Sequence, residues 1–107
     1  MSITRFPLSA ARPLTRSEGY AVELELLQQA RTALARADFA AALAAIAAHE
    51  RRFPNGQLAE EREALRVLAL SGAHQSEDAR RAATAFRKRF PHSLLLTRMN
   101  DALGGAP

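Results

Sequence analysis

The sequence predicts an all-α fold: a stack of helical hairpins with about five helices, the last of which is a C-terminal capping helix. Composition is the first observation behind this prediction. Of the 107 residues, 48% are hydrophobic, and about half of those are alanine. Leucine, arginine and glutamate are also abundant, and all of them favour helix. Valine and isoleucine, which favour strands, occur only twice each.

An internal repeat is the second observation. The segment 38–54, DFAAALAAIAAHERRFP, recurs in a weaker form at 75–91, QSEDARRAATAFRKRFP, with an offset of 37 residues. Both copies end in two cations followed by Phe-Pro, and a polar turn follows each copy. Repeats of this kind are typical of stacked helical hairpins, in which one hairpin buries its apolar face against the next.

The chain is long enough for one domain with a modest core. We expect a flexible or docked arm over 1–17, which has three arginines, two prolines and no acid. A helical domain over 18–103 and a disordered tail over 104–107 should follow. No apolar run approaches the roughly 20 residues of a membrane span, so we expect no membrane insertion. Localisation stays open: cytoplasmic by default, and extracytoplasmic if the chain is an excised domain.

The first helix is expected between about Ser17 and Arg36. Thr15-x-x-Glu18 has the pattern of a capping box at its start. Apolar and small residues recur along one face of this helix, at Leu27, Ala30, Leu34 and Ala37.

The second helix is predicted to begin after Asp38, its N-cap, and to end at the Phe53-Pro54 junction. Most of its residues are alanine, which lets neighbouring helices approach closely. We therefore expect this helix at the centre of the fold. Its large apolar side chains are predicted to be buried between the hairpins, in particular Phe39, Ile46 and Phe53.

Three more helices are expected. The third covers about 57–71, with Asn55 as its predicted cap and Gly72 at its end. Its second half is apolar nearly all round and should be buried. Ser76 is predicted to cap a fourth helix that runs to Phe90. Ser93 is predicted to start a short last helix that covers the open face of the second hairpin.

Several residues of the first copy occupy the offsets of the 34-residue tetratricopeptide pattern: Asp38-Phe39, Ala42, Leu43, Ile46 and Pro54, with Ala30 at the small-residue position of the preceding helix. The second copy keeps Ala79 and Pro91. The chain therefore resembles the tetratricopeptide repeat family. It is more similar to divergent bacterial members such as the repeats of outer-membrane-assembly lipoproteins. The stretch 53–65 resembles one in C-terminal domains of proteobacterial regulators, which are often linked to sigma-factor signalling. These resemblances imply partner binding in bacterial regulation or envelope-associated assembly.

Arrays of helical hairpins present a concave surface formed by the first helix of each hairpin. Here this means the helices expected over 18–36 and 57–71. Arginine is a frequent interface anchor, because its planar fork binds carboxylates while its stem packs. The candidate contacts with a protein or peptide partner are Leu27, Arg31, Leu34, Arg62 and Arg66. We expect a non-catalytic interaction or adaptor module. The alternative is self-association through an exposed end of the stack, which would give a homodimer.

We expect neither an enzyme nor a metal or cofactor site. Cysteine is absent, and no histidine has another ligand at metal-binding spacing. The three histidines are predicted at the surface or its boundary: His49, His74 and His92. The acids Glu60, Glu61 and Glu63 suit the start of a helix through the backbone dipole and need no catalytic role.

Nucleic-acid binding through the basic helix over 77–90 is the alternative from another functional class. The cations of this helix are Arg80, Arg81, Arg87, Lys88 and Arg89. Glu77 and Asp78 lie close enough to neutralise part of this charge, and cations in a last turn suit the helix dipole. The sequence offers no aromatic platform and no phosphate-binding loop. We therefore do not expect nucleic acid as the partner.

Overall fold

A computed structural model describes residues 12–104, and this part of the chain contains five α-helices and no strand. The all-α prediction is therefore confirmed. Residues 1–11 of the expected arm and 105–107 of the expected tail lie outside the described residues. The helices are α1 (Arg16–Ala35), α2 (Phe39–Arg52), α3 (Ala59–Gly72), α4 (Ser76–Arg89) and α5 (Leu96–Ala102).

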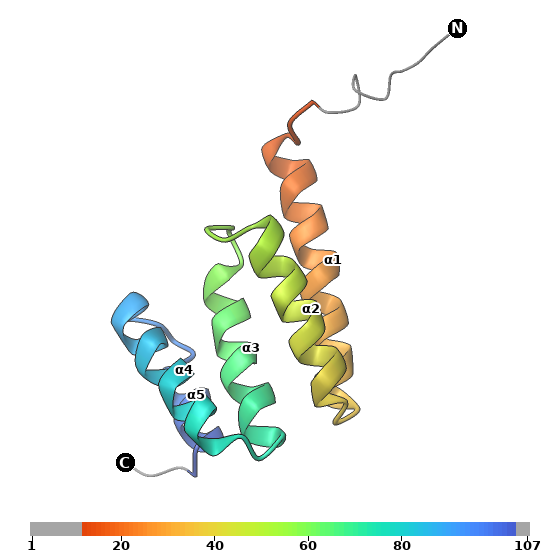
Figure 1. Ribbon diagram of the computed structural model, residues 1–107. Coiled ribbons are helices and arrows are strands. Elements are labelled where there is room, and N and C mark those ends of the chain that lie inside the picture. Colours follow the sequence, from red (N-terminus) through yellow and green to blue (C-terminus); the bar gives the residue numbers. More distant parts are fainter. Residues whose placement is uncertain (1–11, 105–107) are drawn as a thin grey trace, which may run out of the picture.

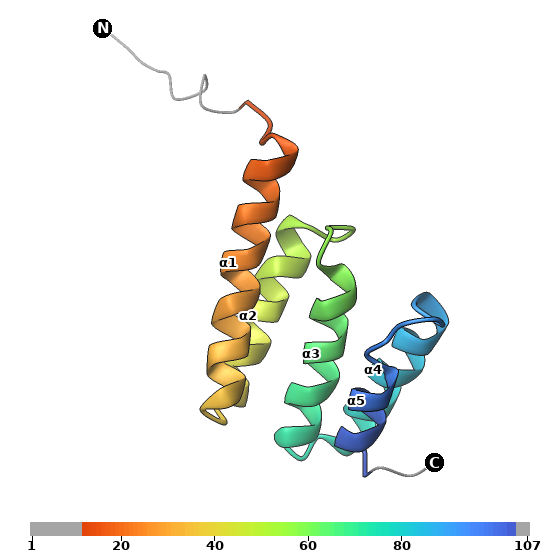
Figure 2. The same cartoon turned by 180° about the vertical axis from the view of Figure 1, so that it is seen from behind.

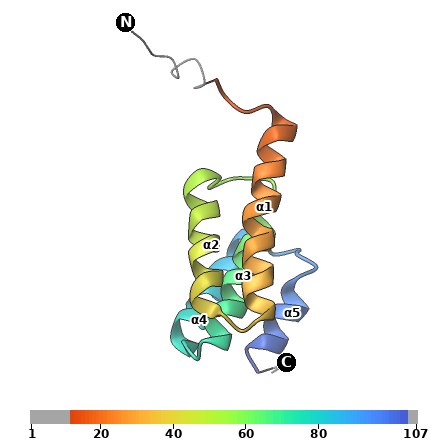
Figure 3. The ribbon, with the colours of Figure 1, turned by 90° about the vertical axis from the view of Figure 1, so that its right-hand side faces the viewer.

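Consecutive helices run antiparallel and form a single stack (Figure 1). Helices α1 and α2 form the first hairpin, and α3 and α4 form the second. Helix α2 packs against both α1 and α3, which is the central position predicted for it. Helix α5 packs against α3, as Figure 2 also shows. In the side view of Figure 3, α2 and α4 lie on one side of the stack and α1 and α5 on the other.

Two of the predicted helix caps are confirmed. The Thr15 hydroxyl accepts a hydrogen bond from the Glu18 backbone N–H over 3.1 Å, and the Glu18 carboxylate accepts from the Thr15 N–H over 2.9 Å. These two bonds complete the capping box of α1. Asp38 accepts from the Ala41 N–H over 3.2 Å at the start of α2.

The other three predicted starts are wrong. Helix α3 begins at Ala59 and Asn55 does not cap it. Ser76 is the first residue of α4 and not its cap. The last helix begins at Leu96, three residues after Ser93. For α3 the reason is physical: a carboxylate of another helix binds the backbone N–H groups that precede α3, as described below, so the loop needs no cap of its own.

The turns inside the two hairpins share one geometry. Ala37 and His74 are equivalent under the 37-residue offset, and both adopt left-handed backbone angles, with φ of 57° and 63°. In each turn, two N–H groups bond back to carbonyls of the last helical turn, for example Asp38 N–H to Ala33 O over 2.8 Å. This is the Schellman arrangement, in which glycine is the usual residue at the left-handed position. The repeat is thus a repeat of backbone geometry as well as of sequence.

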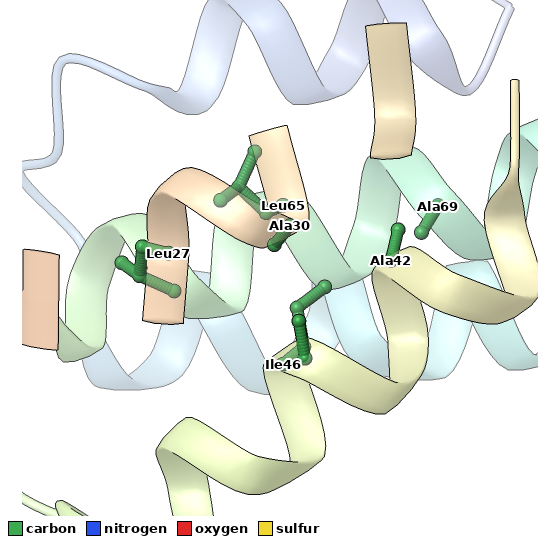
Figure 4. Packing of buried hydrophobic residues seen from close by; sticks show 7 residues of the cluster. Leu27, Ala30, Ala42, Ile46, Leu65 and Ala69 are labelled. Carbon is green, nitrogen blue, oxygen red and sulfur yellow. The ribbon is translucent and has the colours of Figure 1, made fainter. Parts of the chain in front are cut away.

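The core consists of two clusters, one on either side of α3. The first joins α1, α2 and α3, and its side chains point toward one another in Figure 4. It contains Leu27, Ala30, Ala42, Ala45, Ile46, Leu65 and Ala69. The second cluster joins α3, α4 and α5, and contains Ala64, Val67, Ala83, Phe86 and Met99. Because α3 contributes to both clusters, most of its apolar second half is buried as predicted, whereas Leu68 and Leu70 are half-buried.

The predicted burial of α2 is right for Ile46 and only partly right for the two phenylalanines. Ile46 is fully buried, whereas Phe39 and Phe53 are half-buried. Phe39 lies over Gly72 at the end of α3, where an added Cβ atom would come within 2.3 Å of the ring. Such a distance is far inside van der Waals contact, so this packing depends on glycine.

Candidate partner-binding groove and a buried polar cluster

Two of the five predicted contact residues are buried. Leu27 is 0% exposed in the first core cluster, and Arg62 is 1% exposed. The prediction that these two side chains contact a partner is therefore wrong. The helical spacing on α3 did not identify an outward face, because α3 packs against α1, α2, α4 and α5 and has few free positions.

The three remaining predicted contacts are partly accessible, but two of them are engaged within the fold. Arg31 makes a two-bond ion pair with Glu61 that bridges α1 and α3: Nε donates to Oε2 over 2.6 Å, and Nη2 donates to Oε1 over 2.7 Å. This hydrogen bonding raises the pKa of Arg31. Arg66 donates to Glu63 on α3 over 2.9 Å and to Glu50 on α2 over 2.5 Å. Leu34 packs against the first cluster.

A groove of about 130 Å³ lies between α3 and α5. Its floor is apolar, and two charged residues, Glu61 and Arg98, stand beside it. Glu61 is already paired with Arg31, whereas Arg98 is exposed and has no ion-pair partner within residues 12–104. The lining residues are Glu61, Ala64, Leu65, Leu68, Leu95, Arg98 and Met99. We refer to this feature as the α3–α5 groove.

A wider and shallower groove of about 670 Å³ runs along α1 and the start of α2, at the N-terminal end of the stack. Half-buried Leu24 and Ala33 contribute apolar surface, and most of the other lining residues are polar or charged. Among them are Glu25, Gln28, Thr32, Arg36 and Asp38.

Three titratable side chains meet inside the protein where α1, α2 and α3 approach one another. We call Glu23, His49 and Arg62 the buried polar cluster; they are 3%, 0% and 1% exposed. His49 Nε2 lies 2.9 Å from Glu23 Oε1, and Arg62 Nη1 lies 3.3 Å from His49 Nδ1. A carboxylate only accepts and a guanidinium only donates. The contacts therefore fit a neutral imidazole with its proton on Nε2.

The cluster also binds the loop between α2 and α3. Glu23 accepts hydrogen bonds from the backbone N–H groups of Gln57, over 3.1 Å, and Leu58, over 3.0 Å. Burial raises the pKa of Glu23, but the hydrogen bonds from Leu58, His49 and Gln57 outweigh it and the pKa is lowered. Glu23 thus takes over the capping role that the sequence suggested for Asn55.

Arg62 also binds the α2–α3 loop, from the side opposite Glu23. Its guanidinium donates to the carbonyl oxygens of Phe53, over 2.9 Å, and Pro54, over 3.3 Å. Its Nε donates to Glu63 over 2.6 Å. A Cβ atom at Gly56 would lie 2.2 Å from Glu23 Oε1, so glycine at this position leaves room for the carboxylate.

These contacts indicate that the buried polar cluster stabilises the fold. Each side chain of the buried polar cluster is closed off from solvent and has its partners within the protein. The expectation that His49 lies at the surface or its boundary is therefore wrong. His74 and His92 are exposed, as expected. Within residues 12–104, no group of three or more histidines and acids could hold a metal ion.

One signal in the sequence could have located the cluster. Under the 37-residue offset, His49 corresponds to Phe86 and Arg62 to Met99, both of which are buried in the second core cluster. The contact between α2 and α3 thus uses polar residues at positions where the equivalent contact between α4 and α5 uses apolar ones. Glu23 corresponds to Glu60, which accepts a hydrogen bond from the Ser93 hydroxyl at the equivalent loop.

The cations of α4 are largely engaged in local contacts. Arg80 and Arg81 pair with Glu77 and Asp78, as the sequence suggested. Arg87 donates to Asn100 on α5 over 3.1 Å. Helix α4 therefore does not present one continuous row of unpaired cations.

No helix within residues 12–104 has the length and apolar character needed to cross a membrane. Comparison of the chain with known proteins found no match to any family model, curated protein or solved structure.

Proposed function

We propose that this chain is a non-catalytic protein–protein interaction module of the tetratricopeptide-like type, and that a peptide segment of its partner binds in the α3–α5 groove. The observation that carries the proposal is the groove itself, with an apolar floor and the exposed Arg98 at its side. It lies on α3, the first helix of the second hairpin, where hairpin arrays commonly bind their partners.

The chemistry of the groove suits an apolar side chain next to a carboxylate. Half-buried Leu68 and Leu95 offer apolar surface to an inserted side chain, above the buried Leu65 and Met99. Arg98 offers a planar fork of donors that matches a carboxylate. Glu61 offers less to a ligand cation, because Arg31 already occupies both of its oxygens.

The resemblance to lipoprotein repeats and regulator domains supports a role as an adaptor in bacterial regulation or envelope-associated assembly. The Arg31–Glu61 ion pair helps in this role by holding α1 against α3. A partner would then meet a preformed surface and would not have to order it on binding.

Affinity capture followed by quantitative mass spectrometry tests this proposal. Arg98→Glu reverses the charge beside the groove, and Arg16→Glu makes the same change at the exposed start of α1. We expect at least one protein captured by the unmodified chain and by Arg16→Glu, and depleted at least tenfold with Arg98→Glu. Equal capture by all three chains would reject the groove as the site.

Self-association is a second candidate, and the wide groove along α1 and α2 favours it. This groove lies at the end of the stack, where a further helical layer would continue the packing. A second copy of the chain could provide such a layer and give a homodimer.

A further inference from the structure

We propose a second contact surface, a cationic edge that binds an acidic segment of a protein partner. The cationic edge consists of Arg51 and Arg52, at the end of α2, and Lys88 and Arg89, at the end of α4. It is separate from the α3–α5 groove, and the inference goes beyond the function proposed above.

The fold brings these four cations to one edge. Arg51 and Lys88 are equivalent under the 37-residue offset, and so are Arg52 and Arg89. Helices α2 and α4 run in the same direction, so their last turns face the same way (Figure 1). Arg89 Nη2 donates to the Pro54 carbonyl over 3.3 Å and to Asn55 Oδ1 over 3.2 Å. These two bonds tie the end of α4 to the loop that follows α2.

The charge of this edge is not neutralised within residues 12–104. All four side chains are exposed, and none of them forms an ion pair with a carboxylate there. Glu50, next to Arg51 in sequence, is paired with Arg66 instead. The C-terminal dipoles of two helices contribute about −0.5 elementary charge each, so the edge keeps about three positive charges.

Two of the three guanidinium groups of this edge lie over aromatic rings. Arg52 lies 5.5 Å from the centre of the Phe53 ring, and Arg89 lies 5.1 Å from the centre of the Phe90 ring. A guanidinium stacked in this way can still offer its edge donors to a carboxylate. At Arg89 the donors left for this are Nε and Nη1, because Nη2 already bonds to Pro54 and Asn55. The position of a stacked guanidinium is also partly fixed before binding, which lowers the entropy cost of forming that bond.

These features favour an acidic protein segment over nucleic acid. Only four cations are available, whereas tight binding of a duplex rests on many phosphate contacts. Phe53 and Phe90 are half-buried with an arginine over each ring, so neither presents an open face for base stacking. Carboxylates match the two held guanidinium groups directly.

Fluorescence anisotropy with a fluorescein-labelled hexaglutamate peptide at 50 mM salt tests the proposal, with hexaglutamine as the neutral probe. The variant Arg51→Glu/Lys88→Glu reverses two charges of the edge. Its control, Arg80→Glu/Arg81→Glu, makes the same net change on α4 away from the edge. Arg98→Glu, in the α3–α5 groove, separates this surface from the proposed peptide site. Circular dichroism establishes that each chain is folded, and Arg51→Gln/Lys88→Gln replaces the first variant if it is not.

We expect saturable binding of hexaglutamate and none of hexaglutamine. Affinity should fall at least tenfold in the edge variant and less than threefold in the control and in Arg98→Glu. Absence of hexaglutamate binding, or equal losses in the edge and control variants, would overturn the proposal. Tighter binding of a 20-base-pair duplex, or of vesicles with 30% phosphatidylserine, through the same four residues would assign the edge to a different class of partner and would also overturn it.

Discussion

His49 donates a hydrogen bond from Nε2 to Oε1 of Glu23 over 2.9 Å, and both side chains are buried. This contact joins the last turns of α2 to the middle of α1. Because Glu23 also binds the backbone N–H groups of Gln57 and Leu58, the same carboxylate sets the start of α3. One side chain of α1 thus positions the next two helices, and through them the α3–α5 groove.

Glu23→Gln should therefore destabilise the protein strongly. The change places an amide NH2 group against at least one of the three N–H groups that the carboxylate accepts from, and a hydrogen bond to a charged group contributes about 1.5–3 kcal/mol. Urea denaturation followed by circular dichroism measures the free energy of unfolding. Glu60→Gln, at the equivalent but less buried position, is the matched control and should cost less. A loss below about 1 kcal/mol for Glu23→Gln would contradict the stabilising role of this carboxylate, since surface changes usually stay within about 0.5 kcal/mol.

Stability should fall under acid conditions. The folded protein lowers the pKa of Glu23, so the carboxylate adds stability that is fully present above the unfolded pKa of about 4.3. This stability is lost as the pH falls from there through the folded pKa. Thermal melting between pH 7 and pH 3 should show the loss, and Glu23→Gln should show a shallower dependence. Parallel curves for the two proteins would show that Glu23 does not contribute to it. The pKa of Glu63 is also lowered, so part of the slope should remain in the variant.

Ala37→Gly should stabilise the protein. Ala37 has a φ of 57°, and a non-glycine residue with a left-handed backbone costs about 1–2 kcal/mol. Glycine removes this cost, but it also loses more conformational entropy on folding, so only part of the energy is gained. We expect a gain of about 0.5–1 kcal/mol in the free energy of unfolding. His74→Gly, at the equivalent turn, should act in the same direction. Ala35→Gly is the control: within α1 glycine should cost up to about 1 kcal/mol. Destabilisation by Ala37→Gly would mean that the turn is not left-handed in solution.

Self-association should appear as a mass that depends on concentration. If a second copy covers the groove along α1 and α2, light scattering over a hundredfold dilution should show dimers giving way to monomers. Gln28→Glu/Thr32→Glu places two acids in this groove and should favour the monomer. A monomer mass at every concentration would reject the homodimer.

Local signals in the sequence were sufficient for much of this fold. The capping box of Thr15 and Glu18 and the Asp38 cap each lie within four residues of the groups they bind, so they could be recognised directly. The buried polar cluster could not be recognised in this way, because Glu23 and His49 are 26 residues apart and only the folded stack brings them together. Comparison with Phe86 in the second hairpin would have placed His49 inside.

The prediction that Leu27 and Arg62 contact a partner was wrong for a related reason. Helical spacing identifies a face, but it does not show whether another helix covers that face. Leu27 and Arg62 lie on faces of α1 and α3 that α2 and the α2–α3 loop cover. Arg98 was missed because it lies on the short α5, which was expected only to cap the stack.

Site-specific photocrosslinking tests the central claim most directly. A photoreactive amino acid is placed at Leu95, which lines the α3–α5 groove, and in a second chain at Ala85, an exposed position on α4. Both chains are incubated with the same extract and irradiated, and crosslinked products are identified by mass spectrometry. Our account predicts a specific crosslinked protein from position 95 that is absent from position 85. No crosslink from position 95, or the same products from both positions, would contradict it.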